Sequence, residues 1–85
     1  MDIFYSARFH KSYKKLPERI KRFAEKKEIL FRKNPRDSRL KLHKLSGALE
    51  GYLAFSVDFR YRIILEFENQ HTALFYDIGT HEVYD

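Results

Sequence analysis

The segment LAFSVDFRYRIILEFENQHTALFYDI, residues 53–78, decides the fold. Apolar residues alternate with polar or small ones over residues 53–57 and again over residues 60–68, the period of two that is typical of half-buried strands. Residues 69–71 predict a turn, and residues 72–78 form a third run rich in β-branched and aromatic side chains. Three successive strands with short connections favour an antiparallel meander.

The residues before this segment predict one more strand and two helices. Residues 1–5 alternate as a short strand, and Ser6 can cap a helix that ends near Leu16. Pro17 can begin a second helix with one apolar face, and the Asn34-Pro35 step ends it. We therefore expect a single α+β domain over residues 1–85 with the order β-α-α-β-β-β, in which a helical hairpin packs on one face of a small antiparallel sheet.

The composition excludes several classes of protein. The 85 residues include 8 Phe and 6 Tyr, too many for a disordered tail, and no Cys, so disulfide scaffolds and thiolate sites are excluded. No run suits a membrane span or a signal peptide, and we expect a cytoplasmic protein. The net charge of +5 is unevenly distributed. Residues 1–44 hold 15 bases and 5 acids, and residues 45–85 hold 2 bases and 7 acids. The basic half predicts a surface that faces a polyanion.

The sequence carries no strong catalytic motif, and no two of its four histidines are spaced as metal ligands usually are. We therefore expect neither a metal nor a cofactor. Its Arg, Lys, His and Tyr residues can instead bind a phosphodiester and move protons, as cleavage of RNA by its own 2′-hydroxyl requires. The candidates are His43, His81, Arg60, Arg62, Lys44 and Tyr84.

These basic and histidine residues can also be explained without a functional role. The helical bases are often a solvated face, and a histidine near the end of a chain is usually idle. Arg60 and Arg62, two apart on a strand, project from one face and can pair with Glu66 or Asp77 on neighbouring strands.

Three stretches resemble the RelE/ParE superfamily of bacterial and archaeal toxins. They are LSGALEGY at residues 45–52, YRII at residues 61–64 and GTHEVY at residues 79–84. The resemblance covers essentially the whole chain and agrees with the expected element order. It implies the toxin of a type II toxin–antitoxin module, and in most characterised members a ribosome-dependent mRNA interferase that cuts mRNA in the ribosomal A site.

The resemblance also implies roles for particular residues. His43 and His81 are similar to functional histidines of the YafQ branch, Arg62 to the strand arginine that contacts the scissile phosphate in the RelE and YoeB branches, and Tyr84 to their terminal acid/base tyrosine. We expect His81 to be the general acid and either His43 or Glu50 to be the base. The expected phosphate and RNA ligands are Arg62, Arg60, Lys44, Lys41 and Arg39.

The sequence departs from the family at some positions. Leu53 and Phe55 stand where the RelE branch has lysines, and Ser56 and Arg60 replace a histidine and an aspartate of the YafQ branch. Two alternatives therefore stay open: a ParE-like gyrase inhibitor that acts by binding alone, and an inactive member retained for regulation. The implied partners are a cognate antitoxin, with which the chain would form a hetero-oligomer, together with mRNA and the 70S ribosome.

Overall fold

The chain folds in the expected order, with additional short elements in the connector. The computed structural model describes residues 1–81. Its elements are β1 (Asp2–Tyr5), α1 (Ala7–Lys14), α2 (Glu18–Lys33), the 3-10 turn η1 (Ser38–Leu40), β2 (His43–Lys44), the 3-10 turn η2 (Gly47–Leu49), β3 (Leu53–Ser56), β4 (Tyr61–Asn69) and β5 (Thr72–Thr80).

The sheet is larger than the expected meander and is mixed rather than wholly antiparallel. Its strand order is β1-β5-β4-β3-β2. The antiparallel pairing of β3, β4 and β5 confirms the meander. β1 extends it by pairing in parallel with β5, and β2 pairs antiparallel with β3. Both additions supply hydrogen-bond partners to strands that would otherwise end the sheet with unpaired backbone groups.

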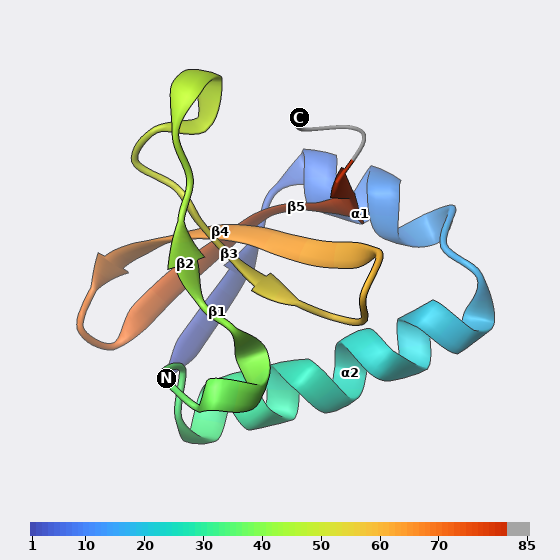
Figure 1. Ribbon diagram of the computed structural model, residues 1–85, viewed down its shortest axis with the longest axis horizontal. Helices are drawn as coiled ribbons and strands as arrows, with labels where there is room; N and C mark the ends of the chain where they lie inside the picture. Colours follow the sequence, from blue (N-terminus) through green and yellow to red (C-terminus); the bar gives the residue numbers. More distant parts are fainter. Residues whose placement is uncertain (82–85) are drawn as a thin grey trace.

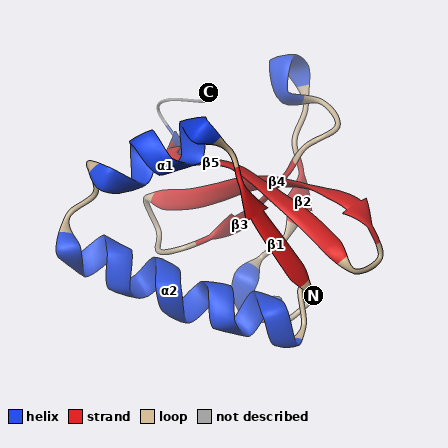
Figure 2. Cartoon of the chain, turned by 180° about the vertical axis from the view of Figure 1, so that it is seen from behind, coloured by secondary structure: helices blue, strands red, loops and turns tan. Residues whose placement is uncertain are grey.

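The residues expected to begin and end the helices do so. The Ser6 side chain accepts a hydrogen bond from the backbone N–H of Phe9 and caps α1. Pro17 immediately precedes α2, and extended Asn34 ends it. Figure 1 shows α1 and α2 joined at one end and diverging from there, with α1 near the end of β5 and α2 along the lower part of the view, and Figure 2 shows the same arrangement from behind.

The core lies between this hairpin and the sheet, and aromatic rings form its centre. Phe31 on α2 is fully buried, with its ring stacked on Phe55 of β3 at a centroid distance of 5.1 Å. The same ring meets Phe75 of β5 edge-on at 5.4 Å. Offset and edge-on contacts are the favourable geometries for aromatic pairs, so three elements are joined at Phe31.

The opposite face of the sheet is partly covered rather than open. Ala54 and Ile64 are fully buried, although alternation along their strands places them away from the helices. Asp77, on the same face, is 3% exposed and lies 3.7 Å from the guanidinium of Arg8 on α1. The Arg8 guanidinium also lies over the Tyr76 ring, 5.5 Å from its centroid.

We expect Phe31→Ala to lower the free energy of unfolding by about 3–5 kcal/mol, because it removes a buried ring and leaves a cavity. Urea denaturation followed by circular dichroism measures this loss. Ile29→Ala is the control, since Ile29 is on the same helix but 57% exposed. Equal losses in the two variants would contradict the central position of Phe31.

Candidate functional site

One hollow on the surface brings together two of the predicted phosphate ligands and the predicted acid. It measures about 440 Å³, and His81 lines it immediately after the end of β5. The connector before β2 contributes Arg39 and Lys41, and α2 contributes Lys27. The remaining lining residues, Ser56, Val57, Asp58 and Phe59, belong to β3 and to the β3–β4 turn. We call this the cationic hollow, because in the part of the chain that the structure describes three basic side chains line it against one carboxylate, that of Asp58.

The connector is held so that its basic residues stay at the surface. Leu40 is fully buried in the core, whereas Arg39 and Lys41 on either side of it are exposed. Lys27 Nζ donates to the backbone oxygen of Arg39 at 3.4 Å, which ties the connector to α2. Burial of one leucine therefore fixes where two cations emerge.

Asp37 holds the Arg39 guanidinium in one orientation. Arg39 Nε and Nη2 donate to the two carboxylate oxygens at 3.0 and 2.9 Å, and the Arg39 backbone N–H donates to Oδ1 at 2.9 Å. These hydrogen bonds from Arg39 lower the pKa of Asp37 from 3.8 to about 2. Only part of the Arg39 fork is engaged in this pair, and the remaining N–H groups are available to a phosphate.

The β3–β4 turn is fixed by the side chain of Asp58. Its Oδ1 accepts from the backbone N–H groups of Arg60 and Tyr61 at 2.8 and 2.7 Å. The Val57 N–H donates to the Tyr61 oxygen at 2.9 Å and closes the turn. Arg60 therefore lies in this turn and is exposed, not on the strand as expected, because the Asp58 carboxylate replaces strand pairing there.

Arg62 lies inside the sheet. It is 6% exposed, and its neighbours in register are Ser56 on β3 and Gly79 on β5. Ser56 lines the cationic hollow, and Gly79 is two residues before His81. Arg60 and Arg62 thus differ in exposure and do not form the shared phosphate-binding face that their spacing predicted.

His43 on β2 is oriented by the connector. It is exposed, and its Nδ1 lies 2.9 Å from the backbone oxygen of Lys41. A carbonyl oxygen can only accept, so the ring donates from Nδ1, and Nε2 of the neutral ring is left as the acceptor. In this tautomer Nε2 can accept a proton. His43 does not line the cationic hollow itself, and its link to the hollow is this hydrogen bond to the backbone of Lys41.

The other predicted residues lie elsewhere. Lys44 and Glu50 line a separate hollow of about 350 Å³ together with Tyr52 and Leu53. The pKa of Tyr52 is raised by burial, with a contribution from the charge of Glu66. Tyr84 lies outside the described residues.

Among the described lining residues, five were not predicted as site residues: Lys27, Ser56, Val57, Asp58 and Phe59. Lys27 was one of many helical bases, and only the packing of α2 against the connector distinguishes it. The short polar interruption at Asp58 within an apolar alternation was the available signal for a turn. Among residues 1–81 no group of three His, Asp or Glu side chains could hold a metal ion, and no helix is long and apolar enough to cross a membrane.

Comparison with known proteins rests on structure, since no family model and no curated protein matches the sequence. The chain is similar to YafQ from E. coli strain BL21(DE3), with a TM-score of 0.80, 25% identity, and coverage of 98% of this chain and 96% of that one. It is similar to a chain of the E. coli DinJ-YafQ toxin-antitoxin complex at a TM-score of 0.77 and 26% identity, covering 96% and 93% of the two chains.

The fold is shared more widely at lower identity. A YoeB/ParE toxin from Agrobacterium tumefaciens matches with a TM-score of 0.78 and 13% identity, over 95% of this chain and 99% of that one. These similarities confirm the expected resemblance to the RelE/ParE superfamily and the expected fold class.

We expect Arg39→Gln to return the pKa of Asp37 from about 2 toward 3.8, which carbon-detected NMR titration measures directly. Because the folded-state pKa is depressed, the pair stabilises the protein above the ordinary pKa, and this contribution is lost as the pH falls through about 2. Arg36→Gln is the control, since Arg36 lines a different hollow beside Met1 and Phe67. An unchanged Asp37 titration in Arg39→Gln would contradict the bidentate pair.

Proposed function

Because the chain has the fold of the RelE/ParE toxins, we propose that it is the toxin of a type II toxin–antitoxin module and acts as a metal-independent mRNA interferase. The observation that carries this proposal is the cationic hollow, in which His81 stands beside Arg39, Lys41 and Lys27. Its occurrence in a chain that matches YafQ over nearly its full length supports RNA as the substrate.

The proposed reaction is attack of a 2′-hydroxyl on the adjacent phosphorus. His43 Nε2 accepts the hydroxyl proton, since Nδ1 is already committed to the Lys41 carbonyl. The new O2′–P bond forms and the P–O5′ bond breaks, which gives a 2′,3′-cyclic phosphate. His81, in its protonated form, donates a proton to the departing O5′. Glu50 remains the second candidate for the base, between β2 and β3 in the hollow that Lys44 also lines.

The charges around the hollow suit the phosphorane that forms between these steps. Lys41 and Arg39 are exposed and can donate to its oxygens, and the exposed Arg60 lies in the adjoining turn. Arg62 is buried on β4, between the two strands that reach the hollow. In this proposal its positive charge adds to the electrostatic potential at the phosphate, and its side chain helps to hold β5 in position. Such groups, fixed before the reaction, stabilise developing charge more than mobile ones do.

Two macromolecular partners follow from this proposal. The DinJ-YafQ complex and the YoeB-YefM complex from Staphylococcus aureus support a cognate antitoxin for this chain. The exposed bases of α1 and α2 would contact ribosomal RNA and hold the toxin at the A site. A gyrase inhibitor that acts by binding alone has no use for a histidine beside three phosphate-binding cations, so the interferase is preferred.

We expect His81→Gln to reduce mRNA cleavage in a translating extract by about 100-fold to 10,000-fold, because the 5′ oxygen then leaves without a positioned acid. Primer extension on a reporter mRNA measures cleavage, and growth after induction measures toxicity. His71→Gln is the matched control, since His71 is exposed in the β4–β5 turn.

Full activity of His81→Gln would contradict its role as the acid. Inhibition of DNA supercoiling by the wild-type protein, without mRNA cleavage, would instead establish the gyrase alternative.

We expect Lys41→Gln to lower the salt dependence of RNA binding, because one phosphate contact is lost. For a single strand the slope of log K against log salt concentration should fall by about 0.7. Fluorescence anisotropy with a short 2′-O-methyl RNA, which cannot be cleaved, measures the slope between 50 and ~200 mM salt. Arg36→Gln, with the same loss of charge, should leave it unchanged; equal effects of the two changes would contradict a phosphate site at Lys41.

A further inference from the structure

Phe59 is an unusually exposed aromatic residue at the edge of the cationic hollow. Its exposed fraction is 84%, whereas Phe4 and Ile29, the other exposed large apolar residues among residues 1–81, have 59% and 57%. Leaving a phenyl ring in water forgoes the stabilisation that burial of a side chain of this size would give. The chain therefore gains nothing in folding from a phenylalanine at this position.

The turn that carries Phe59 is rigid. Asp58 Oδ1 accepts backbone hydrogen bonds from both residues that follow Phe59, at 2.8 and 2.7 Å. The Val57 N–H and the Asp58 N–H both donate to the Tyr61 oxygen, at 2.9 and 3.3 Å. Val57, at the base of the turn, is 2% exposed and packs in the core. The backbone that carries the ring is therefore held in place, and binding a ligand costs little loss of backbone freedom.

The surroundings of Phe59 are cationic rather than apolar. His81, Lys41, Arg39 and Lys27 line the same hollow, and within residues 1–81 no second exposed large apolar side chain lines it. Sites that bind a single strand of nucleic acid combine a positive groove for the backbone with aromatic faces on which bases stack. An apolar protein partner would require a wider apolar patch than one ring.

We propose that Phe59 is a stacking platform for one nucleobase of the RNA strand whose backbone lies in the cationic hollow. This deepens the proposed function and rests on it, since it assigns the residue that positions the strand beside His81. One face of the ring contacts the base, and Lys41 and Arg39 hold the phosphate next to it. Because every base has a stacking face, Phe59 positions the strand without selecting a particular base.

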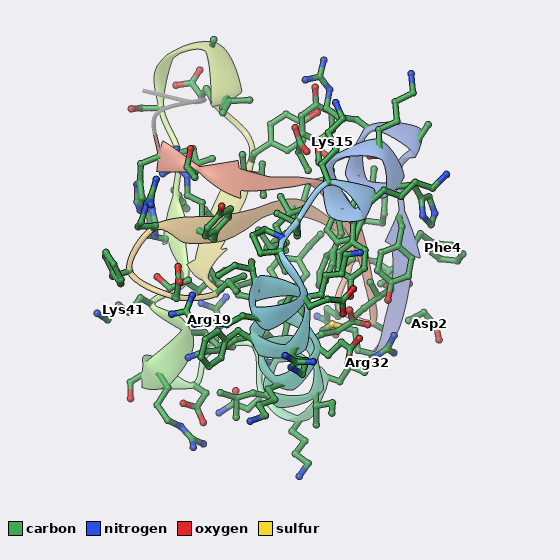
Figure 3. All side chains as sticks on the ribbon, turned by 90° about the vertical axis from the view of Figure 1, so that its right-hand side faces the viewer. Asp2, Phe4, Lys15, Arg19, Arg32 and Lys41 are labelled. Carbon is green, nitrogen blue, oxygen red and sulfur yellow. The ribbon has the colours of Figure 1, made fainter. Side chains whose placement is uncertain are left out.

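The chain offers a matched control for this proposal. Phe4 is also an exposed phenylalanine, but β1 and β3 are separated in the sheet by β5 and β4. Figure 3 shows Phe4 and Lys41 on opposite sides of the molecule. Phe59→Leu and Phe4→Leu therefore make the same chemical change, within and away from the hollow.

The test uses a short 2′-O-methyl RNA with 2-aminopurine, whose fluorescence falls when the base stacks on a ring. The wild-type protein and Phe4→Leu should quench it equally. Phe59→Leu keeps an apolar side chain without a ring and should bind about tenfold more weakly, with the quenching lost. Phe59→Tyr should restore both. Equal thermal unfolding of the variants establishes that the fold is unchanged.

Quenching by Phe59→Leu equal to that of the wild type would overturn the proposal, and so would a wild-type protein that binds this RNA without quenching or does not bind it. Cleavage of mRNA by the wild type is measured separately in a translating extract. Quenching without cleavage would contradict the interferase while leaving the stacking site established. Cleavage without quenching would support the interferase and overturn the stacking site.

Discussion

The parallel pairing of β1 with β5 is the interaction on which the rest of the structure depends. It aligns Asp2 with Thr72 and Tyr5 with Phe75, and the chain enters α1 directly afterwards. Ser6 locks this junction: its backbone N–H donates to the Phe75 oxygen at 3.0 Å and its hydroxyl donates to the Tyr76 oxygen at 2.5 Å. One residue thus caps a helix and attaches it to β5, the neighbour of β1 in the sheet, which sets the direction of the hairpin over the core.

The cationic hollow lies where the basic and acidic halves of the chain meet. Lys27, Arg39 and Lys41 come from the basic half, and Asp58 and His81 come from the acidic half. The end of β5 fixes His81, while buried Leu40 fixes the connector. The net charge suggests a nucleic-acid partner in general, but only the fold concentrates cations at one histidine.

The local part of this structure could be predicted from the sequence, and the non-local part could not. Ser6, Pro17 and Asn34 set the helix ends through their own backbone preferences, and alternation marks β3 to β5. Nothing local indicates that β1 pairs with a strand near the other end of the chain, or that β2 forms in the connector. Arg60 and Arg62 were expected to be equivalent, but the Asp58 side chain holds Arg60 in a turn, β4 begins only at Tyr61, and Arg62 is buried. The resemblance predicted His81, but the residues that surround it could be identified only from the fold.

The β1–β5 pairing also determines when the protein can fold during its synthesis. The first strand has no partner until Thr72, which pairs with Asp2 and lies 70 residues later, has been synthesised. The pairing closes a long loop, and such contacts form slowly compared with helices. The hairpin can form early, yet its apolar face stays uncovered until the sheet is made. The histidine beside β5 is therefore among the last groups to reach its place, and a growing chain carries the cations of the hollow before it carries the acid.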